Sequence, residues 1–156
     1  MTDKELNICL REIARQNGLC DEWYEKWSDE STLDECCRRL VLGFDFACDK
    51  DYPTLSFCRQ NFLERRDILH KHNIYIDEEI NIINAKSGTY IFYGECSGVI
   101  TFRGNSIGNI NLRHKSDIDV FSFENAHVFI SLYDSSKVSY EENEYSKLKV
   151  FDRRNN

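Results

Sequence analysis

Seven cysteines are the residues of this chain best able to do chemistry, because a thiolate can ligate a metal or attack a substrate. Their number is odd, and no Cys-x-x-Cys pair occurs, so the usual spacing of a zinc site is missing. We expect reduced, mostly buried cysteines that act as small apolar residues in a cytoplasmic protein. The seven are Cys9, Cys20, Cys36, Cys37, Cys48, Cys58 and Cys96.

The histidines and the glycines offer no clearer site. His70 and His72 flank Lys71, so their side chains diverge on a helix and make only a pair of metal ligands on a strand. The chain has no Gly-x-Gly-x-x-Gly and no Walker-type phosphate loop. We therefore expect no catalytic residue, no metal and no cofactor, and a protein that is not an enzyme.

The charge and hydropathy of the chain argue against two classes of partner. The formal net charge is -7 at pH 7, and the arginine pairs at 38–39, 65–66 and 153–154 form no basic stripe. Because nucleic-acid binding draws on clustered Lys and Arg, we expect no nucleic-acid partner. There is no apolar run of about 18 residues, so we expect no membrane partner. The polar, acidic first residues argue against a secretory signal.

The second half of the chain must position any functional side chain, and it is a repeat. Residues 86–155 divide into seven ten-residue units, of which six begin with a small residue. Apolar residues recur at positions three, five and seven of the earlier units. This period of two predicts strands with one buried face, each about six residues long and followed by a tight turn. The units begin at Lys86, Cys96, Ser106, Ser116, Ala126, Ser136 and Ser146.

Two architectures fit these units. In a β-solenoid, two strands make one coil of roughly 20 residues. In an antiparallel meander, successive strands form hairpins. The in-phase small residues suit the parallel stacking of equivalent corners, and the turns lack the Asn-Gly and Asp-Gly pairs of tight hairpins. We predict the solenoid and keep the meander as the alternative.

The first half of the chain has the helical period. Thr2 with Glu5, and Thr32 with Glu35, predict capping boxes at the start of two helices, and Gly18 and Gly43 predict their ends. Asp21 is expected to cap a short helix between them, and further helical stretches follow 51–53 and Leu63. The predicted fold class is α+β. A bundle of short helices at residues 1–75 precedes a β-repeat domain at residues 76–156, in which residues 76–85 form a degenerate cap unit.

A resemblance accompanies this architecture. The residues 37–46, 51–57 and 72–77, which read CRRLVLGFDF, DYPTLSF and HNIYID, are similar to those of a family of uncharacterised proteins from gut bacteria and their mobile elements. The resemblance covers roughly Cys36 to the C-terminus. It implies a helical N-terminal region followed by ten-residue β-repeats, and it transfers no functional residue.

The face of the repeats that points outward carries the remaining signal. If alternate units share one side of the coil, aromatic and arginine side chains gather on that side, and protein interfaces are enriched in both. The candidate partner-binding residues are Tyr93, Arg113, Phe129, Tyr133, Phe151 and Arg153. We expect Phe129 and Phe151 to lie close together. Burial of the same residues inside the monomer is an equally good interpretation.

These observations leave two functions open. The first is a non-enzymatic binding or scaffold protein for a protein partner or for its own copy; phage structural components and inhibitors of host defence belong to this class. The alternative is a small ligand-binding protein or enzyme with a pocket between the helices and the first β-coil. An acidic mimic of nucleic acid fits less well, because the charge is spread along the chain.

Overall fold

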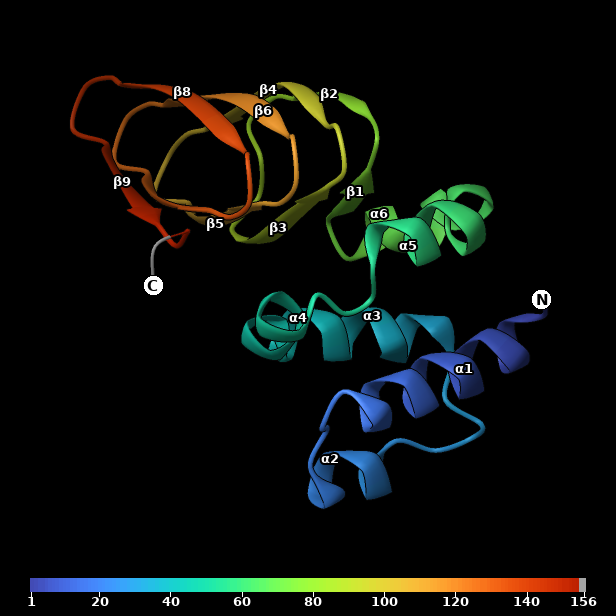
Figure 1. Ribbon diagram of the computed structural model, residues 1–156. Coiled ribbons are helices and arrows are strands. Elements are labelled where there is room, and N and C mark those ends of the chain that lie inside the picture. Colours follow the sequence, from blue (N-terminus) through green and yellow to red (C-terminus); the bar gives the residue numbers. More distant parts are fainter. Residues whose placement is uncertain (155–156) are drawn as a thin grey trace. The chain divides into compact units, whose positions relative to one another are not determined.

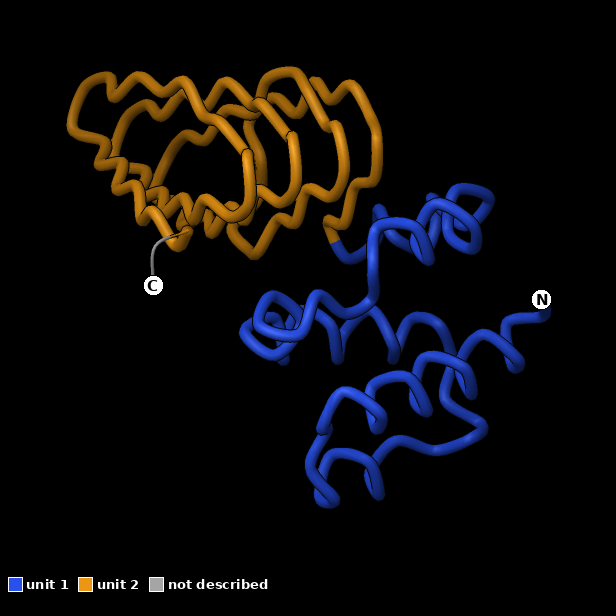
Figure 2. Tube along the Cα trace, in the orientation of Figure 1, with its two compact units in different colours: residues 1–72 blue, residues 73–156 orange. Residues whose placement is uncertain are grey.

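Two compact units make up the chain. The computed structural model describes residues 1–154; Asn155, the last residue of the seventh predicted unit, and Asn156 lie outside the described residues. The chain divides between His72 and Asn73 (Figure 2), whereas the sequence places the boundary after residue 75. The three-residue strand at Ile74–Ile76 belongs to the second unit because it pairs with another strand there.

The order of elements is helices first and strands second, as the α+β prediction requires. Unit 1 contains α1 (Asp3–Gln16), α2 (Asp21–Lys26), α3 (Leu33–Leu42), α4 (Phe44–Lys50), α5 (Leu55–Asn61), the 3-10 turn η1 (Leu63–Arg65) and α6 (Arg66–Lys71). Unit 2 contains β1 (Ile74–Ile76), β2 (Glu79–Ile82), β3 (Gly88–Tyr93), β4 (Ser97–Phe102), β5 (Ile107–Leu112), β6 (Asp117–Ser122), β7 (His127–Leu132), β8 (Lys137–Glu142) and β9 (Lys147–Asp152). No helix among residues 1–154 has the length and apolar character needed to span a bilayer.

The helix ends follow the sequence in part. Thr2 and Glu5 form the full capping box of α1. Thr32 caps α3 by accepting a hydrogen bond from the Glu35 amide. The expectation for Asp21 is wrong: it is the first residue of α2, and Cys20 at the cap makes no side-chain bond. Helix α4 was not expected, because Gly43 was interpreted only as a stop, whereas it ends α3 and starts α4.

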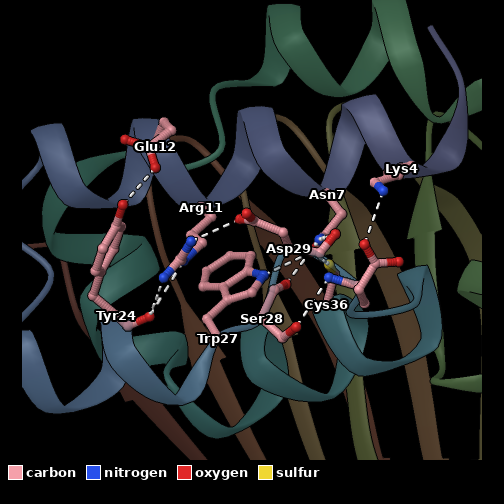
Figure 3. A network of polar contacts seen from close by, with 10 residues as sticks. Lys4, Asn7, Arg11, Glu12, Tyr24, Trp27, Ser28, Asp29 and Cys36 are labelled. Carbon is pink, nitrogen blue, oxygen red and sulfur yellow. Dashed lines mark hydrogen bonds and ion pairs between the residues drawn. The ribbon is translucent and has the colours of Figure 1, made fainter.

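A buried asparagine ties the first helices together. Asn7 on α1 is fully buried, and its amide nitrogen donates to the carbonyls of Ser28 and Asp29 at 3.0 and 3.1 Å (Figure 3). Its amide oxygen accepts from Trp27 Nε1 at 2.7 Å and from Cys36 Sγ at 3.2 Å. A buried amide is stable only when its donors and acceptors are satisfied, so these bonds fix the loop between α2 and α3 against α1.

Replacing Asn7 by Leu tests this role. The variant leaves the Trp27 indole N–H and two carbonyls without their partner, so we expect the free energy of unfolding to fall by about 2 kcal/mol or more. Both tryptophans, Trp23 and Trp27, lie in unit 1. Tryptophan fluorescence during urea unfolding therefore measures the free energy of unfolding of this unit. Asn17→Leu, which removes one bond within α1, is the control and should cost about 1 kcal/mol or less. Equal losses would contradict the role of Asn7.

Unit 2 is a β-solenoid of about four turns of about 20 residues each. One sheet has the strand order β1-β3-β5-β7-β9 and the other has β2-β4-β6-β8, and all pairs are parallel (Figure 1). We call them sheet A and sheet B. From β3 onward, each residue pairs with the residue 20 positions later, as Ile110 does with Ile130. The solenoid prediction is confirmed, and the meander alternative is wrong because successive strands belong to different sheets.

The interior of the solenoid is filled by positions three, five and seven of the units before the last coil. In β5, β6 and β7 these residues are buried and their neighbours point outward. The small residue at position one also points inward, where its hydroxyl satisfies the backbone. Ser136 Oγ donates to the Tyr133 carbonyl, and Ser146 Oγ donates to the Asn143 carbonyl, each at 2.6 Å. A larger side chain at this position would have to enter the packed corner.

Each corner turns on one residue with a left-handed backbone. Positive φ values recur at every tenth residue from 84 to 144, at Asn84, Gly94, Gly104, His114, Glu124, Asp134 and Glu144. Three of the side chains at these positions bond to the preceding coil. Nδ1 of His114 accepts from the Gly94 amide at 3.0 Å, Oε2 of Glu124 accepts from the Gly104 amide at 3.0 Å, and Oδ2 of Asp134 accepts from the His114 amide at 2.9 Å. These bonds offset the strain of a non-glycine residue in this conformation.

The alternation predicts different costs for adjacent residues of β5. Ile110 is buried in the core and Asn111 points outward. Ile110→Ala is expected to lower the free energy of unfolding by about 2–5 kcal/mol, because it leaves a cavity, and Asn111→Ala by less than about 0.5 kcal/mol. Denaturant titration followed by circular dichroism measures both. Similar losses of stability at the two positions would mean that the inward and outward residues of β5 are assigned wrongly.

Candidate functional site

Four of the seven cysteines have buried thiols. Burial raises the pKa of Cys36 to about 11, of Cys37 to about 12 and of Cys96 to about 11, so these thiols stay protonated at neutral pH. Cys58 is also buried, whereas Cys20 is exposed. A nucleophilic cysteine needs the opposite shift, toward the thiolate. The expectation of mostly buried thiols is confirmed for these four, whereas Cys9 and Cys48 are partly buried and Cys20 is exposed.

The described residues contain no cluster of side chains with the composition of a metal site. Within residues 1–154, no three His, Cys, Asp or Glu side chains come together in a way that could hold a metal ion. His72 Nε2 lies 2.9 Å from Asp34 Oδ1, and this hydrogen bond lowers the pKa of Asp34. The pair joins α3 to the end of α6 and has a structural role.

The outer face of sheet A carries a cluster of aromatic and cationic side chains. Phe129 on β7 and Phe151 on β9 stack with their ring centroids 6.5 Å apart, as expected from the sequence. Arg153 lies over the Phe151 ring at 4.8 Å from its centroid, and the Lys149 ammonium lies over the same ring at 5.0 Å. Aromatic rings and arginines are the side chains that most often anchor protein partners.

A shallow depression of about 330 Å³ lies beside these rings, and we call it the aromatic groove. Register explains it: on the outer face, Ser131 stands between Asn111 and Phe151 on the neighbouring strands. A small side chain between two larger ones leaves a hollow on a flat sheet. The groove is lined by Asn109, Ile110, Asn111, Phe129, Ser131, Phe151 and Arg153.

Four of the six predicted partner-binding residues are at least partly exposed to solvent. Phe129 is 37% exposed, Phe151 and Tyr133 are partly buried, and Arg153 is exposed. The outer residues Asn109, Asn111 and Ser131 were not singled out from the sequence. Their signal is their place in the repeat, since they occupy the outward positions four and six of odd units.

The other two predicted residues do not contribute an exposed surface. Tyr93 is 1% exposed and Arg113 is 2% exposed. Arg113 Nε bonds to Asp134 Oδ2 at 2.9 Å, and its guanidinium lies over the Tyr93 ring. For Tyr93 and Arg113, the alternative interpretation of burial within the chain is the correct one. On β3, Ile91 is buried as well.

Charge is divided between the two outer faces. The outward positions of β5, β7 and β9 carry Lys147, Lys149 and Arg153, and no Asp or Glu. The outward positions of β2, β4, β6 and β8 carry Glu79, Asp117, Asp119 and Glu141 beside Arg103 and Lys137. Although the chain is acidic as a whole, the face that holds the aromatic groove is cationic.

Comparison with known proteins yields no relative: no family model matches the chain, and neither a curated protein nor a solved structure does. The resemblance to the gut-bacterial proteins therefore rests on the residues quoted for it.

The burial of the thiols predicts how they react. We expect Ellman's reagent to label Cys20 in the fastest phase, because its thiol is exposed, and to label Cys36, Cys37, Cys58 and Cys96 only slowly. All seven should react in denaturant. Cys20→Ser should remove the fast phase and change nothing else. Cys9 and Cys48 are partly buried and should react at intermediate rates. Fast labelling of Cys36, Cys37, Cys58 or Cys96, located by mass spectrometry, would contradict their burial.

Proposed function

We propose that this protein is a non-enzymatic binding protein that holds another protein against the aromatic groove. The observation that carries the proposal is the stacked pair of Phe129 and Phe151 with Lys149 and Arg153 over the second ring. Protein interfaces favour this combination, because the rings bury apolar area while the cations orient the partner.

The chemistry of the groove selects a class of partner. Its cations have no acid beside them on the outward positions of β5, β7 and β9, so a partner with Asp or Glu side chains would be attracted. The rings of Phe129 and Phe151 would pack against an apolar or aromatic side chain that lies between those acidic residues of the partner. The partner that fits is an acidic protein segment with an apolar anchor, and the amides of Asn109 and Asn111 can bond its backbone.

The cellular context of the protein is suggested by the sequence resemblance. The resemblance to proteins of gut bacteria and their mobile elements supports a cytoplasmic protein of such an element, with a β-repeat of ten residues as its scaffold. A phage structural component and an inhibitor of host defence both use a rigid surface of this kind. The identity of the captured protein distinguishes them.

Site-specific crosslinking tests the groove. A photo-crosslinking amino acid at Asn111 is expected to capture a defined protein in cells of the source organism. The same amino acid at Asp119, on the outer face of sheet B, should not capture it. The crosslink at Asn111 should weaken with added salt, because screening reduces the attraction of the cations.

Paired substitutions separate binding from folding. Phe129→Ser with Phe151→Ser should abolish the crosslink while the chain stays folded, because both rings are partly exposed and their mutual contact contributes only about 1 kcal/mol. Phe121→Ser with Phe123→Ser makes the same change on sheet B and should leave the crosslink intact. Retention of the crosslink in the groove variant would disprove the proposal.

Two other results would point elsewhere. Binding of a single-stranded oligonucleotide, measured by fluorescence anisotropy and lost in the groove variant, would replace the protein partner with nucleic acid. A rise in melting temperature with common nucleotides or divalent metals would favour the ligand-binding alternative.

A further inference from the structure

Among residues 1–154, the last coil of the solenoid has no strand beyond it. Sheet A ends at β9 and sheet B ends at β8. One edge of each strand pairs with β7 or β6, and no strand among residues 1–154 pairs with the other edge. We define the open end as these two free edges together with the inward side chains Val138, Tyr140, Leu148 and Val150. An unpaired edge of this kind is a template for another strand.

The open end exposes residues of core type. Tyr140 is 54% exposed, although it occupies the inward position five of its unit. Val138, Leu148 and Val150 are only partly buried against the core. In the coil before, the residues at the same positions are buried almost completely: Ile118, Val120, Val128 and Ile130. One further layer of strands would bury the last coil to the same degree.

The backbone of the free edges is arranged for pairing. The amides of Lys147 and Arg153 donate to β7, to the carbonyls of Ala126 and Leu132, each at 2.9 Å. Backbone groups alternate between the two edges of a strand. The N–H and C=O groups of Leu148 and Val150 therefore point to the free edge of β9.

Strand β8 has the same arrangement. The amides of Lys137 and Asn143 donate to the carbonyls of Ser116 and Ser122 at 2.9 and 3.0 Å. The N–H and C=O groups of Val138 and Tyr140 therefore point to the free edge of β8. In both strands the inward apolar residues are the ones with unpaired backbone groups at that edge.

We propose that the open end binds the open end of a second copy of this chain, with β8 of each copy antiparallel to β9 of the other. Because β8 and β9 are the two sides of one coil, a two-fold axis parallel to the strands makes both pairs at once. Val138 then faces Val150 of the other copy, and Tyr140 faces Leu148. Each is a pair of inward residues that exchange both backbone hydrogen bonds.

The charges fit this register. It places Glu141 opposite Lys147 of the other copy and Ser139 opposite Lys149. Opposite charges across an antiparallel pair are stabilising, and like charges are destabilising. The other two-fold arrangement, β9 against β9 in the register that keeps inward residues together, places Lys149 opposite itself. The same arrangement pairs β8 with β8 and places Lys137 opposite Glu141. The repulsion between the two Lys149 side chains is therefore what favours the pairing of β8 with β9.

The open end of one copy does not match the first strands of the solenoid in a second copy. Strands β1 and β2 have three and four residues, whereas β8 and β9 have six each. Head-to-tail stacking would leave part of each longer edge unpaired, so the pairing closes with two copies instead of growing into a fibre. This inference does not rest on the aromatic groove.

Proline scanning of the free edge gives the first test. Light scattering after size-exclusion chromatography should give the full chain a mass of twice its 18.4 kDa. Tyr140→Pro removes an amide that no strand among residues 1–154 accepts, so the variant should fold and be a monomer. Phe129→Ser, in the groove, should remain a dimer. A wild-type mass of 18.4 kDa at the highest attainable concentration would overturn the proposal, as would a dimeric Tyr140→Pro variant.

A charge exchange tests the register with variants whose folding is not at risk. Glu141→Lys and Lys147→Glu should each weaken the dimer, roughly tenfold in dissociation constant, because each places like charges opposite each other at two symmetric positions. The double variant Glu141→Lys with Lys147→Glu should restore it. Glu141→Lys with Lys137→Glu should not. Rescue by the second combination, or no change in any variant, would overturn the pairing of β8 with β9.

Discussion

The left-handed residue at each corner is the constraint on which the solenoid depends. It recurs at every tenth position from Asn84 to Glu144, where the chain passes from one sheet to the other. At three of the non-glycine corners, His114, Glu124 and Asp134, the side chain bonds to the corner of the preceding coil. The strain at a corner is thus offset by a bond that also sets the spacing of the coils. Strand register follows from the corners.

A regular register turns single residues into columns. Outward positions of β5, β7 and β9 line up, so Asn109, Phe129 and Lys149 are neighbours although they are 20 residues apart. The aromatic groove is a place where one member of a column, Ser131, is small. The surface therefore depends on differences between units, whereas the core depends on their similarity.

The polar residues of the interior show what limits the repeat. Position seven is Phe or Leu in the first coils, Ser122 in β6, and Glu142 and Asp152 in the last coil. Ser122 remains buried because its hydroxyl bonds to that of Ser146 at 2.7 Å. A carboxylate cannot be buried in this way without a partner, and Asp152 instead pairs with Arg154 at the surface. The column of apolar residues at position seven thus ends before the last coil.

The sequence by itself determined the two-part architecture, the period of the strands and the inward residues such as Ile110, because hydrophobic alternation is local and repeated. It also determined the outward position of Phe129 and Phe151. Only the tertiary structure decided that Tyr93 and Arg113 are buried, since burial depends on what covers a strand and not on which way its side chain points. The left-handed backbone of Glu124 and Glu144 was likewise hidden from the sequence, because glutamate has no preference for it and adopts it only where stacked corners impose it.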